Sequence, residues 1–161
     1  MVALCTRAPA FQKYEANEEM ILDWTKIFTH LFSVAVAYLL ALPLAWDREK
    51  EARSAGLRTF PLVAVASCGY MLVAASILGA TSESMTRILA GLVTGIGFIG
   101  GGAILKDRGS VHGTATAASI WNTGAIGAAV AFRRYEIAVV LSLINFVTLR
   151  LLTPLKQKLK E

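Results

Sequence analysis

Long apolar runs alternate with short charged segments along most of this chain. The apolar runs cover residues 27–46, 60–79, 88–105, 114–132 and 137–152. Each is close to the roughly 20 residues with which a helix crosses the hydrocarbon core of a bilayer. The runs are continuous rather than alternating, and a helix satisfies its own backbone hydrogen bonds in lipid. The pattern therefore predicts an all-α fold, a polytopic transmembrane helical bundle of about five spans.

The segments outside these runs are polar. Residues 1–26 form a polar N-terminal tail, residues 27–152 form the transmembrane domain, and residues 153–161 form a basic C-terminal tail. No apolar stretch precedes Ile27, so we expect an uncleaved first span rather than a removed signal peptide. Because only nine residues follow Leu152, we expect no soluble C-terminal domain.

The charged loops predict an orientation. Loops 47–59 and 106–113, together with the C-terminal tail, hold nine Lys and Arg residues. The N-terminal tail and loops 80–87 and 133–136 hold six. Cytoplasmic loops of membrane proteins carry an excess of Lys and Arg. We therefore expect the N-terminus outside and the C-terminus in the cytoplasm.

Composition narrows the classes of function. Hydrophobic residues make up 55% of the chain and charged residues 17%, with a mean hydropathy of +0.57. A soluble domain carries roughly 25% charged residues. The composition therefore argues against a soluble enzyme domain, a disordered tail or a disulfide scaffold, and makes the lipid bilayer the first partner. The net charge of +5 is scattered between apolar runs, which favours membrane orientation over nucleic-acid binding.

The third apolar run is rich in glycine. Gly95-Ile-Gly97-Phe-Ile-Gly100 matches the dinucleotide-binding pattern, but it lacks the preceding strand and soluble helix that this pattern needs. Small residues four apart let transmembrane helices approach closely. Two such pairs lie on different faces: Gly91 with Gly95, and Gly97 with Gly101. Glycine on several faces predicts a central helix with neighbours all round, and a helix broken around a binding site is the alternative.

Polar residues form a stripe on the fourth run. Residues three and four apart share one face of a helix, and hydroxyl or amide groups on that face can hydrogen-bond to neighbouring spans. We favour this interpretation over a polar cavity for an ion or small solute. The fifth run repeats the pattern and is a source of partners. The stripe comprises Thr116, Ser119 and either Asn122 or Thr123, with Trp121 beside it, and the candidate partners are Ser142, Asn145 and Thr148.

Groups that could carry chemistry are scarce. No Asp or Glu lies in the middle of any apolar run, whereas proton-coupled transporters use buried carboxylates as relays. A magnesium channel would also need carboxylate or carbonyl oxygens. The two histidines, His30 and His112, fall on opposite sides of the membrane in this topology. We therefore expect neither enzymatic activity nor a cofactor.

Charged residues gather on the expected cytoplasmic side. They form a candidate interaction surface, for which topology and contact with lipid head groups are the simplest roles. Asp47 and Arg58 are candidates for an interfacial ion pair that holds the first loop. The surface comprises Asp47, Arg48, Arg58, Lys106, Asp107, Arg108 and His112.

Several motifs resemble the MgtC/SapB (YhiD) family of membrane proteins. One is the loop Ala55-Gly-Leu-Arg-Thr59, and another is Val93-Thr-Gly-Ile-Gly-Phe-Ile-Gly-Gly-Gly102. The resemblance covers roughly residues 30–152. His112 stands where the family usually has arginine, which alters the expected partner surface. Asp47 stands where the family usually has glutamate. The matching motif residues are Arg48, Gly56, Leu57, Arg58, Thr59, Gly95, Gly97, Gly100, Gly102, Gly113, Thr116 and Trp121; Ser119 and Asn122 join them from the polar stripe.

The resemblance implies a multi-pass protein of the bacterial inner membrane, linked to adaptation to magnesium limitation and to virulence. It implies a non-catalytic regulator that contacts another membrane complex, such as the ATP synthase or a transport protein. A transporter or channel for Mg²⁺ or another small solute is the alternative. The glycine pairs are also compatible with a homodimer.

Overall fold

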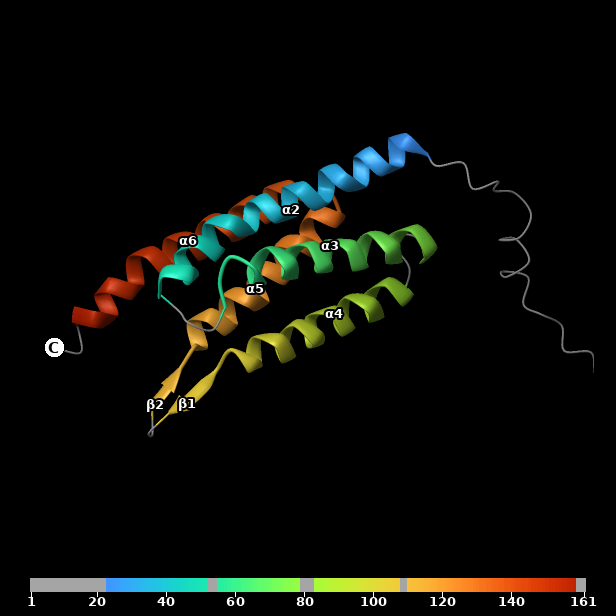
Figure 1. Cartoon of the computed structure of the whole chain (residues 1–161). Coiled ribbons are helices and arrows are strands. Elements are labelled where there is room, and N and C mark those ends of the chain that lie inside the picture. Colours follow the sequence, from blue (N-terminus) through green and yellow to red (C-terminus); the bar gives the residue numbers. More distant parts are fainter. Residues whose placement is uncertain (1–22, 52–54, 79–82, 108–109, 159–161) are drawn as a thin grey trace, which may run out of the picture.

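Five helices and one short hairpin make up the described part of the chain (Figure 1). The computed structural model describes residues 23–51, 55–78, 83–107 and 110–158. Most of the predicted N-terminal tail, Arg108, the side chain of Asp107 and the end of the C-terminal tail lie outside these residues. The elements are α2 (Trp24–Glu51), α3 (Thr59–Leu78), α4 (Glu83–Gly102), β1 (Leu105–Asp107), β2 (Ser110–His112), α5 (Thr114–Ala131) and α6 (Tyr135–Lys158). The predicted all-α bundle is confirmed.

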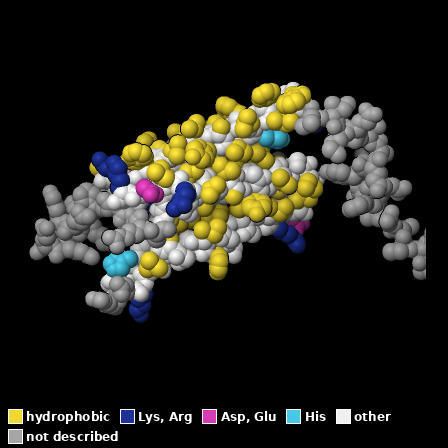
Figure 2. Space-filling model, viewed as in Figure 1, with side chains coloured by type: hydrophobic (Ala, Val, Ile, Leu, Met, Phe, Trp, Pro, Cys, Tyr) yellow, Lys and Arg dark blue, Asp and Glu magenta, His cyan; other side chains and the backbone are white. Residues whose placement is uncertain are grey.

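Helices α2, α3, α4 and α6 are each long and apolar enough to cross a membrane. On the face shown in Figure 2, hydrophobic side chains cover the middle of the bundle, and charged side chains lie toward its two ends. An apolar surface of this extent is unfavourable in water. The chain is therefore a multi-pass membrane protein whose apolar surface is covered by the lipid bilayer.

The central helix of the bundle is α5. Ten of its 18 residues are buried, and it contacts each of the other four helices. It is rich in Ala, Gly, Thr and Ser, and it is not among the four helices that qualify as spans by length and composition. A helix enclosed by protein needs no bulky side chains facing lipid, and small side chains let its neighbours approach.

The glycine-rich helix α4 lies at the edge of the bundle (Figure 1), so the prediction that it is central is wrong. Its buried residues are Met85, Ile96 and Gly100. Bulky side chains such as Phe98, which is 86% exposed, alternate with the glycines and point away from the protein. Glycine on several faces therefore does not by itself place a helix in the centre.

Helix α2 begins earlier than the first apolar run because Asp23 caps it. The Asp23 carboxylate accepts hydrogen bonds from the backbone N–H groups of Thr25 (3.0 Å) and Lys26 (3.3 Å), the arrangement of a helix N-cap. The bond from the Lys26 backbone contributes most to lowering the pKa of Asp23. The helix thus starts at Trp24 rather than at residue 27.

Two helices also continue beyond the predicted ends of their spans. Helix α2 runs on to Glu51 instead of ending at residue 46, because Arg, Glu and Lys support helix formation outside the apolar run. Asp47 and Arg48 therefore belong to a helix and not to the first loop. Helix α6 reaches Lys158, so part of the predicted C-terminal tail is helical.

Helix α5 approaches its neighbours most closely where it or they carry glycine. A methyl group on Gly127 would collide with the carbonyl oxygen of Ala64 in α3 and lie 2.9 Å from the Cβ of Ser67. A methyl group on Gly100 of α4 would lie 3.0 Å from the carbonyl oxygen of Ala117. The single hydrogen of glycine allows these backbone contacts.

An antiparallel hairpin joins α4 to α5, where the sequence predicted only a loop. Leu105 pairs with His112 across its two strands. Gly113 then turns the chain into α5 with a φ of +86°, and a side chain there would collide with the carbonyl oxygen of Ala103. The end of α2, the start of α3 and this hairpin lie at the same end of the bundle (Figure 1), which we call the hairpin end.

Candidate functional site

A buried ion pair lies at the hairpin end of α2. The Arg48 guanidinium donates a hydrogen bond of 2.7 Å to the Asp47 carboxylate, and both side chains are 7% exposed. Loss of either partner alone would leave the other charge buried and unpaired, which destabilises a protein strongly. The predicted pair of Asp47 with Arg58 is wrong, because Asp47 pairs with its neighbour and Arg58 is exposed.

The Gly56–Thr59 motif forms the turn that starts α3. The backbone carbonyl of Gly56 accepts hydrogen bonds from the N–H groups of Thr59 (3.0 Å) and Phe60 (3.2 Å). The N–H of Leu57 donates to the Glu49 carboxylate at 2.9 Å. The motif therefore fastens the start of α3 to the end of α2. Sequence reasoning missed Glu49, because nothing in the linear pattern shows that the loop folds back onto this residue.

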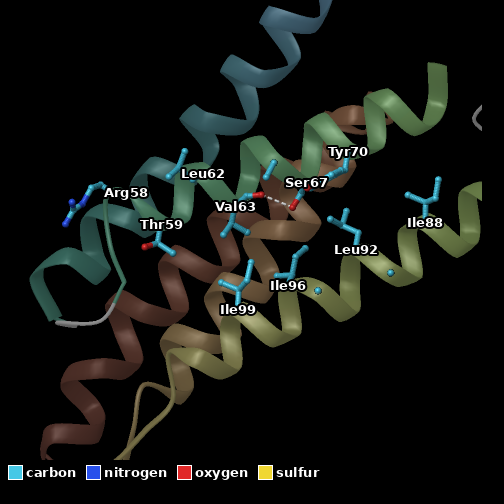
Figure 3. A pocket seen from close by; sticks show the side chains of 13 residues that line it. Arg58, Thr59, Leu62, Val63, Ser67, Tyr70, Ile88, Leu92, Ile96 and Ile99 are labelled. Atoms are coloured by element: carbon cyan, nitrogen blue, oxygen red, sulfur yellow. Dashed lines mark hydrogen bonds between the residues drawn. The ribbon is translucent and has the colours of Figure 1, made fainter. Parts of the chain in front are cut away.

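A groove of about 680 Å³ separates α3 from α4 (Figure 3). Arg58 and Thr59 lie at the hairpin end of this groove. The hydroxyl of Ser67 donates to the carbonyl oxygen of Val63 at 2.7 Å, so this polar group is already paired. The remaining walls are largely apolar and include Leu62, Val63, Ala66 and Tyr70 from α3, and Ile88, Leu92, Ile96 and Ile99 from α4.

The glycines of α4 singled out by the sequence lie on three different faces of the helix. Gly91 and Gly95 line the groove. Gly100 packs against α5, as described above. Gly97 and Gly101 lie on the face of α4 that points away from both, which we call the outward face. A methyl group on any of these glycines except Gly100 would meet nothing within 4 Å, and the same holds for Gly102.

The polar stripe of α5 closes against neighbouring helices. The hydroxyl of Ser119 donates to the amide oxygen of Asn145 in α6 at 3.0 Å. The amide of Asn122 donates to the carbonyl oxygen of Leu141 at 3.2 Å. In α6, Ser142 donates to the carbonyl oxygen of Leu40 in α2 at 2.7 Å. Ser119 and Asn122 thus form the interhelical hydrogen bonds that the stripe predicted, whereas Ser142, a predicted partner of the stripe, bonds to α2 instead.

The other predicted residues of α5 have different surroundings. Thr116 and Thr123 are buried, and the Thr123 hydroxyl donates to the Ser119 carbonyl at 2.7 Å. Trp121 is 52% exposed and lies on the side that faces α4, beside Gly124. Trp121 is therefore not part of the hydrogen-bonded stripe.

His112 lies on the hairpin, apart from these helices. Its Nε2 is 2.7 Å from the hydroxyl oxygen of Ser110, and both side chains are exposed. Within the described ranges, no three His, Cys, Asp or Glu side chains are grouped so that they could hold a metal ion.

Comparison with known proteins places this arrangement in a family. The profile of the MgtC family matches residues 34–158, which include all five helices in whole or in large part. The chain belongs to the MgtC family. No solved structure matches it significantly.

MgtC-family relatives share the membrane domain but extend beyond it. Protein MgtC of Brucella abortus is 34% identical over 137 residues, covering 85% of this chain and 57% of the relative. The protein slr0014 of Synechocystis is 40% identical over 106 residues, covering 66% of this chain and 43% of the relative. Protein SrpB of Synechococcus elongatus is 31% identical, with 79% and 75% covered. The chain thus spans about half the length of the first two relatives.

Proposed function

We propose that this MgtC-family protein is a non-catalytic regulator of the bacterial inner membrane that acts by contact with another membrane complex. The observation that carries the proposal is the outward face of α4. Gly97 and Gly101 leave open space on this face. Ala90 and Thr94 share it by helical spacing and are exposed. A row of small residues of this kind lets a second transmembrane helix approach closely.

The resemblance to the family supplies the biological setting of the proposal. It suggests adaptation to magnesium limitation, with a link to virulence, and a partner such as the ATP synthase or a transport protein. Ser119 and Asn122 both donate hydrogen bonds to α6. Because these polar groups are used in helix packing, they support regulation over transport. The buried charges of Asp47 and Arg48 likewise pair with each other, which supports a structural role for them over ion binding.

Photo-crosslinking in native membranes tests the proposal. A photoreactive residue in place of Thr94 on the outward face is expected to capture one discrete membrane protein after gentle extraction. Gly97→Leu fills the outward face and should abolish this product. Gly95→Leu is the matched control, because it adds the same side chain to open space on the groove side.

Three results would contradict the proposal. One is the absence of any discrete cross-linked protein, and another is equal loss of the product in both leucine variants. Capture of only a second copy of this chain would indicate a homodimer instead of a regulated complex.

We further propose that the N-terminus lies outside and that the hairpin end faces the cytoplasm. Exposed Lys50, Arg58 and Lys106 at the hairpin end support this orientation, as does the excess of Lys and Arg in the corresponding loops. A reporter fused after Glu161 should be active only as a cytoplasmic enzyme. Activity that requires the periplasm would reverse the orientation.

A transporter or channel is the second candidate function, and one observation favours it. The amide nitrogen of Asn145 is buried and has no hydrogen-bond partner among the described residues, so a polar solute could use this donor. Vesicles containing the protein would then take up a small polar solute that carries a hydrogen-bond acceptor, and Asn122→Leu would reduce the uptake. Absence of flux for every tested solute would eliminate this candidate.

A further inference from the structure

The groove between α3 and α4 matches one leaflet of a bilayer in length. Its wall on α3 runs from Arg58 to Tyr70, which is about 18 Å along a helix that rises 1.5 Å per residue. The hydrocarbon part of one leaflet is about 15 Å deep, half of the bilayer core. A transmembrane partner helix would cross both leaflets, so the length of the groove fits a lipid chain better than a helix.

The distribution of polar and apolar residues along the groove also favours a lipid as its ligand. Arg58 is the one charged residue that lines it, and it lies exposed at the hairpin end (Figure 3). Among the described residues Arg58 forms no ion pair, so its charge is available to a ligand. Thr59 adds a hydroxyl group at the same end. An apolar slot with a cationic mouth fits an amphiphile with a hydrocarbon tail and an anionic head group.

We propose that this groove binds an anionic phospholipid from the leaflet at the hairpin end. Its phosphate group lies on Arg58, and one acyl chain lies between α3 and α4. Gly91 and Gly95 provide the width of the slot, because both leave open space where other residues would place a side chain. The site is separate from the outward face of α4, so it does not depend on the proposed regulatory contact.

Native mass spectrometry of the full-length, delipidated protein tests this site. The protein is titrated with phosphatidylglycerol, which is anionic, or with phosphatidylcholine, which carries no net charge. One phosphatidylglycerol molecule is expected to bind more tightly than phosphatidylcholine. Arg58→Gln should weaken its binding about fivefold, the effect of one basic group at an anionic surface, and Arg58→Lys should largely retain it.

Two leucine variants separate the groove from the rest of α4. Gly95→Leu fills the groove and should remove the tightly bound lipid. Gly97→Leu adds the same side chain to open space on the outward face and should leave lipid binding unchanged. Equal affinity for the two lipids, or retention of phosphatidylglycerol by Gly95→Leu, would overturn the proposal. So would equal loss of the lipid in both leucine variants. Loss of a cross-linked protein in Gly95→Leu with unchanged lipid binding would assign the groove to a protein instead.

Discussion

Replacing Gly127 with alanine tests whether the close approach of α3 and α5 holds the bundle together. The added methyl group would collide with the backbone carbonyl of Ala64, which cannot rotate away as a flexible side chain can. Overfilling a packed interior costs about 1–3 kcal/mol. Gly97→Ala is the matched control, because its methyl group meets nothing within 4 Å. Alanine stabilises a helix interior relative to glycine by up to about 1 kcal/mol, so the two variants should change stability in opposite directions.

Cys68 provides a local probe for this prediction. Its side chain is completely buried in the core of α3, next to Ser67, which faces Gly127. In a Cys5→Ser background, the rate at which a maleimide labels Cys68 reports how often this core opens. A loss of 1–3 kcal/mol raises the open fraction roughly 5- to 150-fold.

The labelling rates test whether the contact between Gly127 of α5 and Ala64 of α3 holds the bundle together. Fast labelling in Gly127→Ala and slow labelling in Gly97→Ala are the expected results. If the parent and both variants label at the same rate, the contact between Gly127 and Ala64 does not hold the bundle together, and the steric reasoning is refuted.

Three further predictions concern single polar groups. Asp47→Ala leaves Arg48 buried without its counter-ion and should lower the unfolding free energy in lipid nanodiscs by about 3–5 kcal/mol. Replacing both residues with apolar ones should cost less, and equal losses in the two variants would contradict this prediction. Ser119→Ala removes the hydrogen bond to Asn145 and should cost about 0.6 kcal/mol, the average for transmembrane helices, so a loss of several kcal/mol in the same assay would be inconsistent with an ordinary interhelical bond. The folded-state pKa of Asp23 should lie below its ordinary value of 3.8. The stability that Asp23 contributes by capping the helix is then fully present above pH 3.8 and is lost as the pH falls through the folded-state pKa. An NMR titration midpoint at or above 3.8 would refute this prediction.

The sequence by itself determined that this is a membrane protein with five helical segments. Continuous apolar runs of about 20 residues have one stable form in lipid, because the backbone must bond to itself there. One of the partners predicted for the polar stripe is confirmed, since Ser119 on α5 bonds to Asn145 on α6, whereas Ser142 bonds to α2 instead. Helical spacing alone places such side chains on one face, so these features follow from local physics.

The tertiary structure alone decided which helix is central and which faces stay open. Helix α4 carries six glycines and α5 only two, yet Gly127 of α5 touches another backbone, whereas Gly97 of α4 faces open space. Sequence spacing shows that one face of a helix consists of small residues, but it does not show which helix lies opposite that face. In the same way, Ser142 meets Leu40 across 102 positions of the chain. Contacts of this kind depend on how whole helices pack, and that packing also created the groove headed by Arg58.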